Sequence, residues 1–100
     1  MDIVHYPERN HFETVVDGTT AYVAYLADET HLDIRHTIVP EAIGGRGIAS
    51  ALVRTAYDYA RSHGLKPVAT CSYAAVWLQR HPEYGGTTSA DYGGNESCAL

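Results

Sequence analysis

The chain has 100 residues, of which 45% are hydrophobic, so the sequence predicts one domain with a small apolar core. The formal net charge of -5 argues against a nucleic-acid-binding protein, and no stretch approaches the length and hydropathy of a membrane span. Cys71 and Cys98 are the two cysteines and form no CxxC motif, so we predict no metal site. Because the N-terminus also lacks the basic and apolar regions of a signal peptide, we expect a cytoplasmic protein in which a disulfide between these cysteines is disfavoured.

The first part of the chain predicts an antiparallel meander. Residues 1–10 show no clear period, whereas residues 11–16 alternate as a strand and Asp17-Gly18 is a strong hairpin signal. Residues 20–27 follow as a second strand with two largely apolar faces, so we expect it in the centre of the sheet. A polar turn leads to a third strand over residues 31–39. Its two faces are predicted to hold Leu32, Ile34, His36 and Ile38 on one side and Asp33, Arg35 and Thr37 on the other.

A Gly-rich turn separates this meander from an amphipathic helix. The turn spans residues 44–49 and begins three residues after Val39-Pro40, and apolar residues recur at helical spacing over residues 46–63. Gly64 is a natural end for that helix. The order of strand, Gly-rich turn and helix places free backbone N–H groups at a helix N-terminus, where the helix dipole favours an anion such as phosphate.

The rest of the chain predicts one more strand and one more helix. Lys66-Pro67 opens a strand that continues over residues 68–72, and we expect it beside the third strand, in parallel, after a right-handed crossover. Residues 73–80 predict a short second helix that ends at His81-Pro82. Residues 85–100 are rich in glycine and small polar residues, and we expect them to form a mobile tail.

Charge and motif comparison narrow the ligand of the Gly-rich turn. Residues 44–66 hold four basic residues and one acidic residue, although the chain as a whole is acidic. A solvated helix face explains most such runs, but here the run begins at the turn, which favours an anionic ligand. The Gly-Lys-Ser/Thr of a Walker loop is absent, and neither the glycine spacing nor the antiparallel strands fit a dinucleotide fingerprint.

The order of these elements resembles the acyl-CoA-binding half of the GNAT N-acetyltransferase superfamily. The pyrophosphate motif of that superfamily is Arg/Gln-x-x-Gly-x-Gly/Ala, which Gly47 and Ala49 match. Gly44 stands where the family has Arg or Gln, and Arg46 is a partial replacement. The chain also resembles a compact subfamily of GNAT-like proteins over residues 11–84. The further landmarks are His36-Thr37-x-Val39-Pro40, Cys71-x-Tyr73 and His81-Pro82-Glu83-Tyr84.

The resemblance implies an α/β (α+β) fold of the truncated GNAT type. We expect a domain over residues 1–84 with a mixed sheet of about four strands, formed by the antiparallel meander and one parallel strand, and two helices. The resemblance also implies bound acetyl-CoA or another acyl-CoA, with its pyrophosphate on the Gly-rich turn and its pantetheine between the third and fourth strands. The implied cofactor-binding residues are Thr37, Ile38, Val39, Gly44, Gly45, Arg46, Gly47, Ile48 and Ala49.

Three residues are candidates for catalysis, and each has a structural alternative. Cys71 is either a small buried side chain or an acyl acceptor, and direct attack by the amine on the thioester needs no such nucleophile. His36 is either a satisfied core histidine or a base. Tyr73, like Tyr84, is either a packing residue or a general acid for the departing thiolate. His81 is a helix stop that the resemblance makes a candidate lock for the C-terminal segment.

The sequence therefore predicts an N-acetyltransferase that uses acetyl-CoA and acts on a small amine or a protein amine that the sequence does not identify. The alternative is a non-catalytic acyl-CoA-binding or protein-interaction module, because the chain is short for the superfamily and Gly44 departs from its motif. The chain is either a monomer or a homo-oligomer, and in an oligomer the partner chain would supply the acceptor site. No nucleic acid or membrane is expected as a partner.

Overall fold

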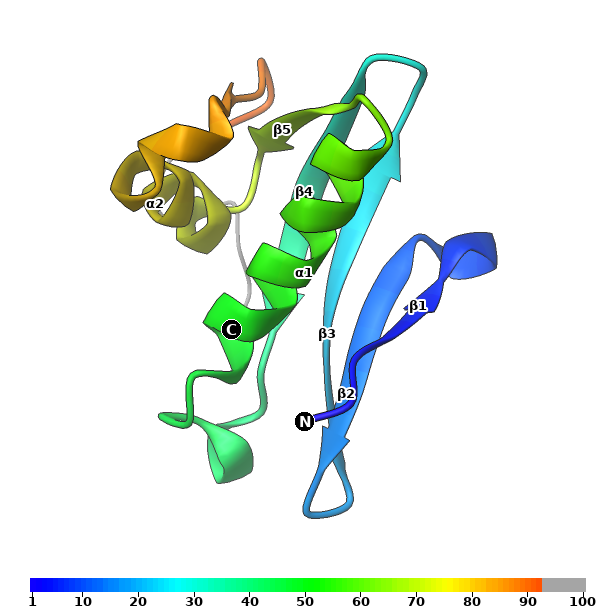
Figure 1. The fold of residues 1–100 in the computed structure, drawn as a ribbon. Helices are drawn as coiled ribbons and strands as arrows, with labels where there is room; N and C mark the ends of the chain where they lie inside the picture. Colours follow the sequence, from blue (N-terminus) through cyan, green and yellow to red (C-terminus); the bar gives the residue numbers. More distant parts are fainter. Residues whose placement is uncertain (93–100) are drawn as a thin grey trace.

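The computed structural model describes residues 1–92 as one six-stranded mixed sheet with two α-helices (Figure 1). Neither helix in this part of the chain is long and apolar enough to cross a membrane. The strands lie in the sheet in sequence order, β1-β2-β3-β4-β5-β6. Their bounds are Val4–Tyr6 for β1, His11–Val16 for β2, Thr19–Ala27 for β3, His31–Ile38 for β4, Lys66–Ala69 for β5 and Thr87–Thr88 for β6. The helices are Ile48–Ser62 for α1 and Ser72–Arg80 for α2, and short 3₁₀ turns cover Pro7–Arg9, Glu41–Ile43 and Pro82–Tyr84.

Strands β1 to β4 form an antiparallel meander. The hairpin predicted at Asp17-Gly18 is confirmed: both residues have positive φ, 51° and 75°, as a tight two-residue hairpin turn requires. Strand β3 lies between β2 and β4, and its Ala21 and Val23 are fully buried, which confirms its predicted central place. Strand β1 was not predicted, because three residues are too short to show a period.

A β-bulge in β4 corrects the predicted faces of that strand. In the register with β3, His36 pairs with Ala24 and Ile34 pairs with Tyr25, so Arg35 has no counterpart. The extra residue reverses the alternation for the rest of the strand. Thr37 is therefore fully buried and His36 is exposed, and the prediction that His36 shares the core face of Ile34 is wrong.

The core lies between the sheet and the helices. Helix α1 packs across β2 to β5, and its Leu52 and Val53 have no exposed surface, so each contributes ~1.5–3 kcal/mol by burial. Buried Tyr57 of α1 donates its hydroxyl proton to the carbonyl oxygen of Val68, at 2.7 Å, which fixes α1 against β5. Helix α2 covers β5 and β6 on the same side of the sheet.

The C-terminal part of the sheet is parallel. Strand β5 pairs in parallel with β4, as predicted, and ends at Ala69, three residues before the predicted end. Strand β6 adds a second parallel pairing, Val68 with Thr87 and Ala69 with Thr88, inside the segment that the sequence assigned to a tail. The remainder of that predicted tail, from residue 93 on, lies outside the described residues, so its mobility stays a prediction.

Candidate functional site

The sheet opens where β5 ends. Strands β4 and β5 pair only from His31 with Lys66 to Ile34 with Ala69. The carbonyl oxygen of Ile34 then accepts hydrogen bonds from the backbone N–H groups of both Thr70 and Cys71, at 3.0 and 3.1 Å. Beyond that point β4 continues to Ile38, whereas the segment after β5 turns into α2 (Figure 1). The two strands therefore diverge next to the N-termini of both helices.

The N-terminus of α1 has free donors and no side-chain cap. Gly45 and Gly47 both have φ of 75°, a backbone conformation that side chains with a Cβ rarely adopt, and Gly47 is the N-cap residue. Ala51 N–H donates to the Gly47 carbonyl oxygen at 3.1 Å and is the first backbone donor satisfied within the helix. The N–H groups of residues 48–50 thus point out of the helix end, where the dipole makes the potential positive.

These donors border a cavity of about 330 Å³. Tyr73, in the first turn of α2, is half-buried and lines the same cavity as the Gly-rich turn. A second cavity, of about 240 Å³, shares Ser50 and Tyr73 with the first and continues between the helices. The first cavity is lined by Val39, Gly44, Gly45, Gly47, Ile48, Ala49, Ser50 and Tyr73, and the second adds Val76, Trp77, Arg80 and His81.

Most of the cofactor-binding residues predicted from the sequence meet in the first cavity, but three do not. Arg46 is exposed and points elsewhere: its guanidinium donates to the carboxylate of Asp17, in the β2–β3 turn, at 2.7 Å. Thr37 and Ile38 line neither cavity. The residues that the sequence missed are Ser50 and the α2 side chains Trp77 and Arg80, for which no short motif existed.

Cys71 is a fully buried residue at the N-cap position of α2. Its Sγ lies 3.3 Å from the Oγ1 of Thr37. Cys71 is disulfide-bonded, and no cysteine in the described part of the chain is free, so the expectation that a disulfide is disfavoured is wrong for this residue. Cys98 lies outside the described residues. Burial and the absence of a free thiol in residues 1–92 favour the structural interpretation of Cys71 over that of an acyl acceptor.

Residues 81–84, which follow α2, contact both helices through ring stacking and hydrogen bonds. The ring of His81 stacks on Trp77 with centroids 3.9 Å apart, and its Nδ1 lies 2.7 Å from the Trp77 carbonyl oxygen. The Tyr84 hydroxyl donates to Asp58 of α1 at 2.6 Å and accepts from Arg54 at 3.3 Å. Burial, and secondarily Asp58, raise the pKa of Tyr84. Tyr84 lines neither of the two cavities, in contrast to Tyr73, and these contacts favour its packing role.

The sequence of this chain matches a known protein family and several curated relatives. Residues 11–87 match the family model described as GCN5-related N-acetyl-transferase. The chain belongs to the GCN5-related N-acetyltransferase family. Among curated relatives, Protein NATD1 of Xenopus tropicalis is 31% identical over 84 residues, which are 80% of this chain and 76% of that protein. Protein NATD1 of Danio rerio is 32% identical over 90 residues, 84% of this chain and 81% of that protein.

A solved structure of the same family shares the fold. The solution structure of a GCN5-like protein from Staphylococcus aureus superimposes with a TM-score of 0.67 at 27% identity, covering 88% of this chain and 87% of that one. The likeness confirms the predicted mixed α/β fold of the GNAT type. Within residues 1–92, no group of three or more His, Cys, Asp or Glu side chains is placed to hold a metal ion.

Proposed function

We propose that this GNAT-family protein binds acetyl-CoA at the N-terminus of α1 and transfers the acetyl group to a primary amine. The observation that carries the proposal is the N-terminus of α1, which has no side-chain cap, follows a Gly-rich turn and borders a cavity that Tyr73 also lines. A diphosphate matches these donors, because several N–H groups and the helix dipole converge on the same volume.

The remainder of the CoA molecule has a continuous path from that point. The second cavity extends from Ser50, which it shares with the first cavity, to Arg80, an exposed cation in the last turn of α2. Arg54 lies nearby over the face of Trp77, 5.3 Å from its ring centroid. These two cations favour the negatively charged nucleotide end of CoA on this side, whereas the opening between β4 and β5 is the place for the pantetheine arm.

The reaction is an acyl transfer between a thioester and an amine. The amine nitrogen attacks the acetyl carbonyl carbon, the new N–C bond forms, and the C–S bond breaks with its electron pair on sulfur. We assign protonation of the departing thiolate to the phenol of Tyr73, because its side chain lines the cavity beside the Gly-rich turn. The proton lost by the amine passes to water or to His36, which is exposed on the opposite face of β4.

Direct attack fits the described residues better than transfer through Cys71, since that side chain is fully buried. The second candidate function is an acyl-CoA-binding module without turnover. It is favoured by Gly44 and by the pairing of Arg46 with Asp17, which together leave the diphosphate site without a side-chain cation.

Calorimetry and turnover together test these alternatives. We expect acetyl-CoA to bind with measurable heat, and thiol release from acetyl-CoA to increase when aliphatic amines are added. Binding without thiol release across the amine panel would favour the module. Neither heat nor a thermal shift at millimolar acetyl-CoA would overturn the proposal itself.

A further inference from the structure

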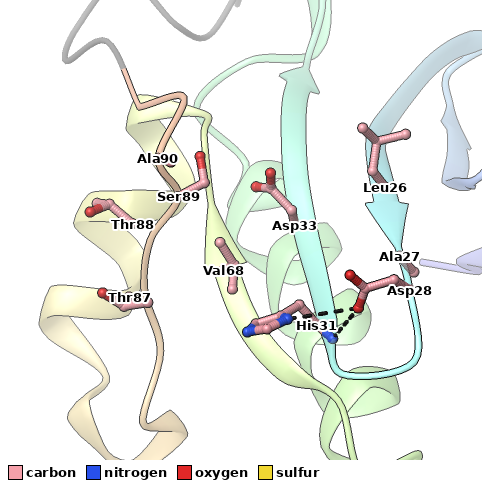
Figure 2. A pocket seen from close by; sticks show the side chains of 10 residues that line it. All are labelled: Leu26, Ala27, Asp28, His31, Asp33, Val68, Thr87, Thr88, Ser89 and Ala90. Carbon is pink, nitrogen blue, oxygen red and sulfur yellow. Dashed lines mark hydrogen bonds and ion pairs between the residues drawn. The ribbon is translucent and has the colours of Figure 1, made fainter.

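A larger cavity lies on the face of the sheet that carries no helix (Figure 2). It has a volume of about 420 Å³ and shares no lining residue with the two cavities at α1. Its floor is formed by the β3–β4 turn and by the first residues of β4, and the segment of residues 87–90 forms the far wall. Leu26, Ala27 and Val68 contribute apolar surface.

Asp33 is the more buried of the two carboxylates that line this cavity. Its side chain is only 15% exposed, and both of its carboxylate oxygens accept the hydroxyl of Thr70, at 2.9 and 3.1 Å. Arg35 adds a longer contact of 3.3 Å. The hydroxyl oxygen of Thr70 also forms a hydrogen bond with the hydroxyl oxygen of Ser89, at 2.5 Å. A carboxylate with two oxygens has room for a further donor beside these partners, so Asp33 is fixed in place without being saturated.

The charge around the cavity favours a cation. Asp28 and Asp33 are the two carboxylates that line the cavity, and the guanidinium of Arg35, outside the lining, makes its shorter bond to Asp91 at 2.9 Å. These two lining carboxylates carry a formal charge of −2 when His31 is neutral. His31 Nδ1 lies 3.7 Å from Asp28, so a protonated ring would be balanced locally. The adjacent Lys66 is not among the lining side chains.

The position of Asp33 connects this cavity to the opening between β4 and β5. Asp33 immediately precedes Ile34, whose carbonyl oxygen holds the last residues before the strands diverge. Because side chains alternate along a strand, Asp33 faces away from α1 while Ile34 faces the core. The cavity therefore borders the pair Asp33–Val68, next to the last pair of β4 and β5, on the face opposite the α1 cavity.

We propose that this cavity is the acceptor site and that it binds an aliphatic primary amine as its ammonium ion. The ammonium group donates to the Asp33 carboxylate, and the alkyl chain lies against Leu26 and Val68. Before its nitrogen attacks the thioester, the ammonium ion loses one proton to water or to His36. The substrate class is thus a small aliphatic amine or an exposed lysine side chain, not an anionic or aromatic acceptor. The role of the cavity as an acceptor site rests on the proposed acetyl transfer, but the binding of an amine to the cavity can be tested independently.

The test is an NMR titration of the ¹⁵N-labelled full chain, saturated with CoA, with n-butylamine at pH 7 and with 1-butanol as the neutral isostere. We expect butylammonium to shift the amide signals of Asp33, Val68 and Ser89, and 1-butanol to bind at least tenfold more weakly. Asp33→Asn, which keeps an oxygen for the Thr70 hydroxyl, should weaken butylammonium binding at least tenfold. Glu29→Gln removes an exposed charge from the same β3–β4 turn outside the cavity and should change it less than twofold.

A second variant of the cavity, Leu26→Trp, keeps the test valid if Asp33→Asn does not fold. Leu26 is 55% exposed, so Leu26→Trp narrows the cavity with little disturbance of the core, and it should also abolish the amine-induced shifts. CoA affinity, measured by calorimetry, should remain within twofold in all three variants. Equal binding of butylammonium and 1-butanol, or unchanged amine binding in Asp33→Asn, would overturn the acceptor site while CoA binding still stands. Loss of CoA binding in the unmodified chain would instead overturn the proposed function.

Discussion

The guanidinium of Arg46 donates to the carboxylate of Asp17 at 2.7 Å, so the cation of the Gly-rich turn is engaged by the β2–β3 turn and not by the cavity. Both side chains are largely exposed, at 49% and 69%, and exposed ion pairs contribute only ~0–1 kcal/mol. A diphosphate bound at the N-terminus of α1 can therefore compete with Asp17 for Arg46. In the proposed function, the Arg46–Asp17 pair therefore determines whether the positive charge of Arg46 is available to the diphosphate of CoA.

Removing the carboxylate of this pair should strengthen CoA binding. In Asp17→Asn the local negative charge is lost and Arg46 is released, so we expect Kd for CoA to fall by roughly two- to fivefold at low ionic strength, with the gain lost in high salt. Calorimetry at two salt concentrations measures it. An unchanged Kd at low salt would show that Arg46 has no part in the site.

Gly44 is the position at which a missing cation can be restored. Its backbone is ordinary, with φ of −68°, and a Cβ added there would lie 3.4 Å from the Glu41 carbonyl oxygen, a normal contact. We expect Gly44→Arg to tighten CoA binding by about tenfold, the effect of roughly 1.4 kcal/mol from one charge-assisted contact. Gly44→Ala is the matched control and should leave the affinity within twofold. Equal affinities of the two variants would contradict the placement of the diphosphate beside residue 44.

Tyr73 should affect the chemical step more than binding. Tyr73→Phe keeps the ring that lines the cavity and removes the hydroxyl, so we expect kcat to fall by roughly 10²-fold while the Kd for acetyl-CoA changes less than threefold. Tyr84→Phe is the comparison, since that hydroxyl bonds Asp58 away from the cavities and its loss should lower stability with kcat retained. A larger loss of kcat in Tyr84→Phe than in Tyr73→Phe would reverse the assignment.

Stability should fall in mild acid because of His5. Partial burial, and then the charge of His63, lower the pKa of His5, with Glu8 opposing, and Nε2 of His5 lies 2.6 Å from the hydroxyl of Tyr25. The unfolded chain, with an ordinary pKa of about 6.5, then binds the proton more readily than the folded one, so the unfolding free energy decreases as pH falls below about 6.5. Denaturation at pH 7 and pH 5 should show a smaller difference for His5→Gln than for the unmodified chain. An NMR-titrated His5 pKa above 6.5 would contradict this.

Elements with a sustained period could be predicted from the sequence, and short or irregular ones could not. The alternation of β2 and β3 and the helical spacing of α1 each extend over enough residues to be read, and their bounds agree within about two residues. Strand β6 has two residues and depends on pairing with β5, which no local pattern reveals. The bulge at Arg35 likewise depends on the register with β3, and it alone moved His36 out of the core.

The candidate site divides in the same way. The α1 cavity was predictable because its ligand-facing groups are backbone N–H groups, whose position the glycine spacing encodes directly. The cavity around Asp33 was not, because its lining residues come from β3, the β3–β4 turn, β4, β5 and residues 87–90 and form no run in the sequence. The direction of Arg46 was also hidden, since its partner Asp17 is 29 residues away.

The most direct test of the account is a titration of the ¹⁵N-labelled chain with CoA, followed at the backbone amides. The account predicts saturable shifts that are largest at Gly45, Gly47, Ile48, Ala49 and Ser50 and extend to Tyr73. Gly47→Ala should weaken them at least tenfold, because alanine is strained at φ of 75°, the conformation of the N-cap residue of α1. Shifts centred on the opposite face around Asp33, or no shifts at millimolar CoA, would contradict the central claim that the N-terminus of α1 binds the diphosphate.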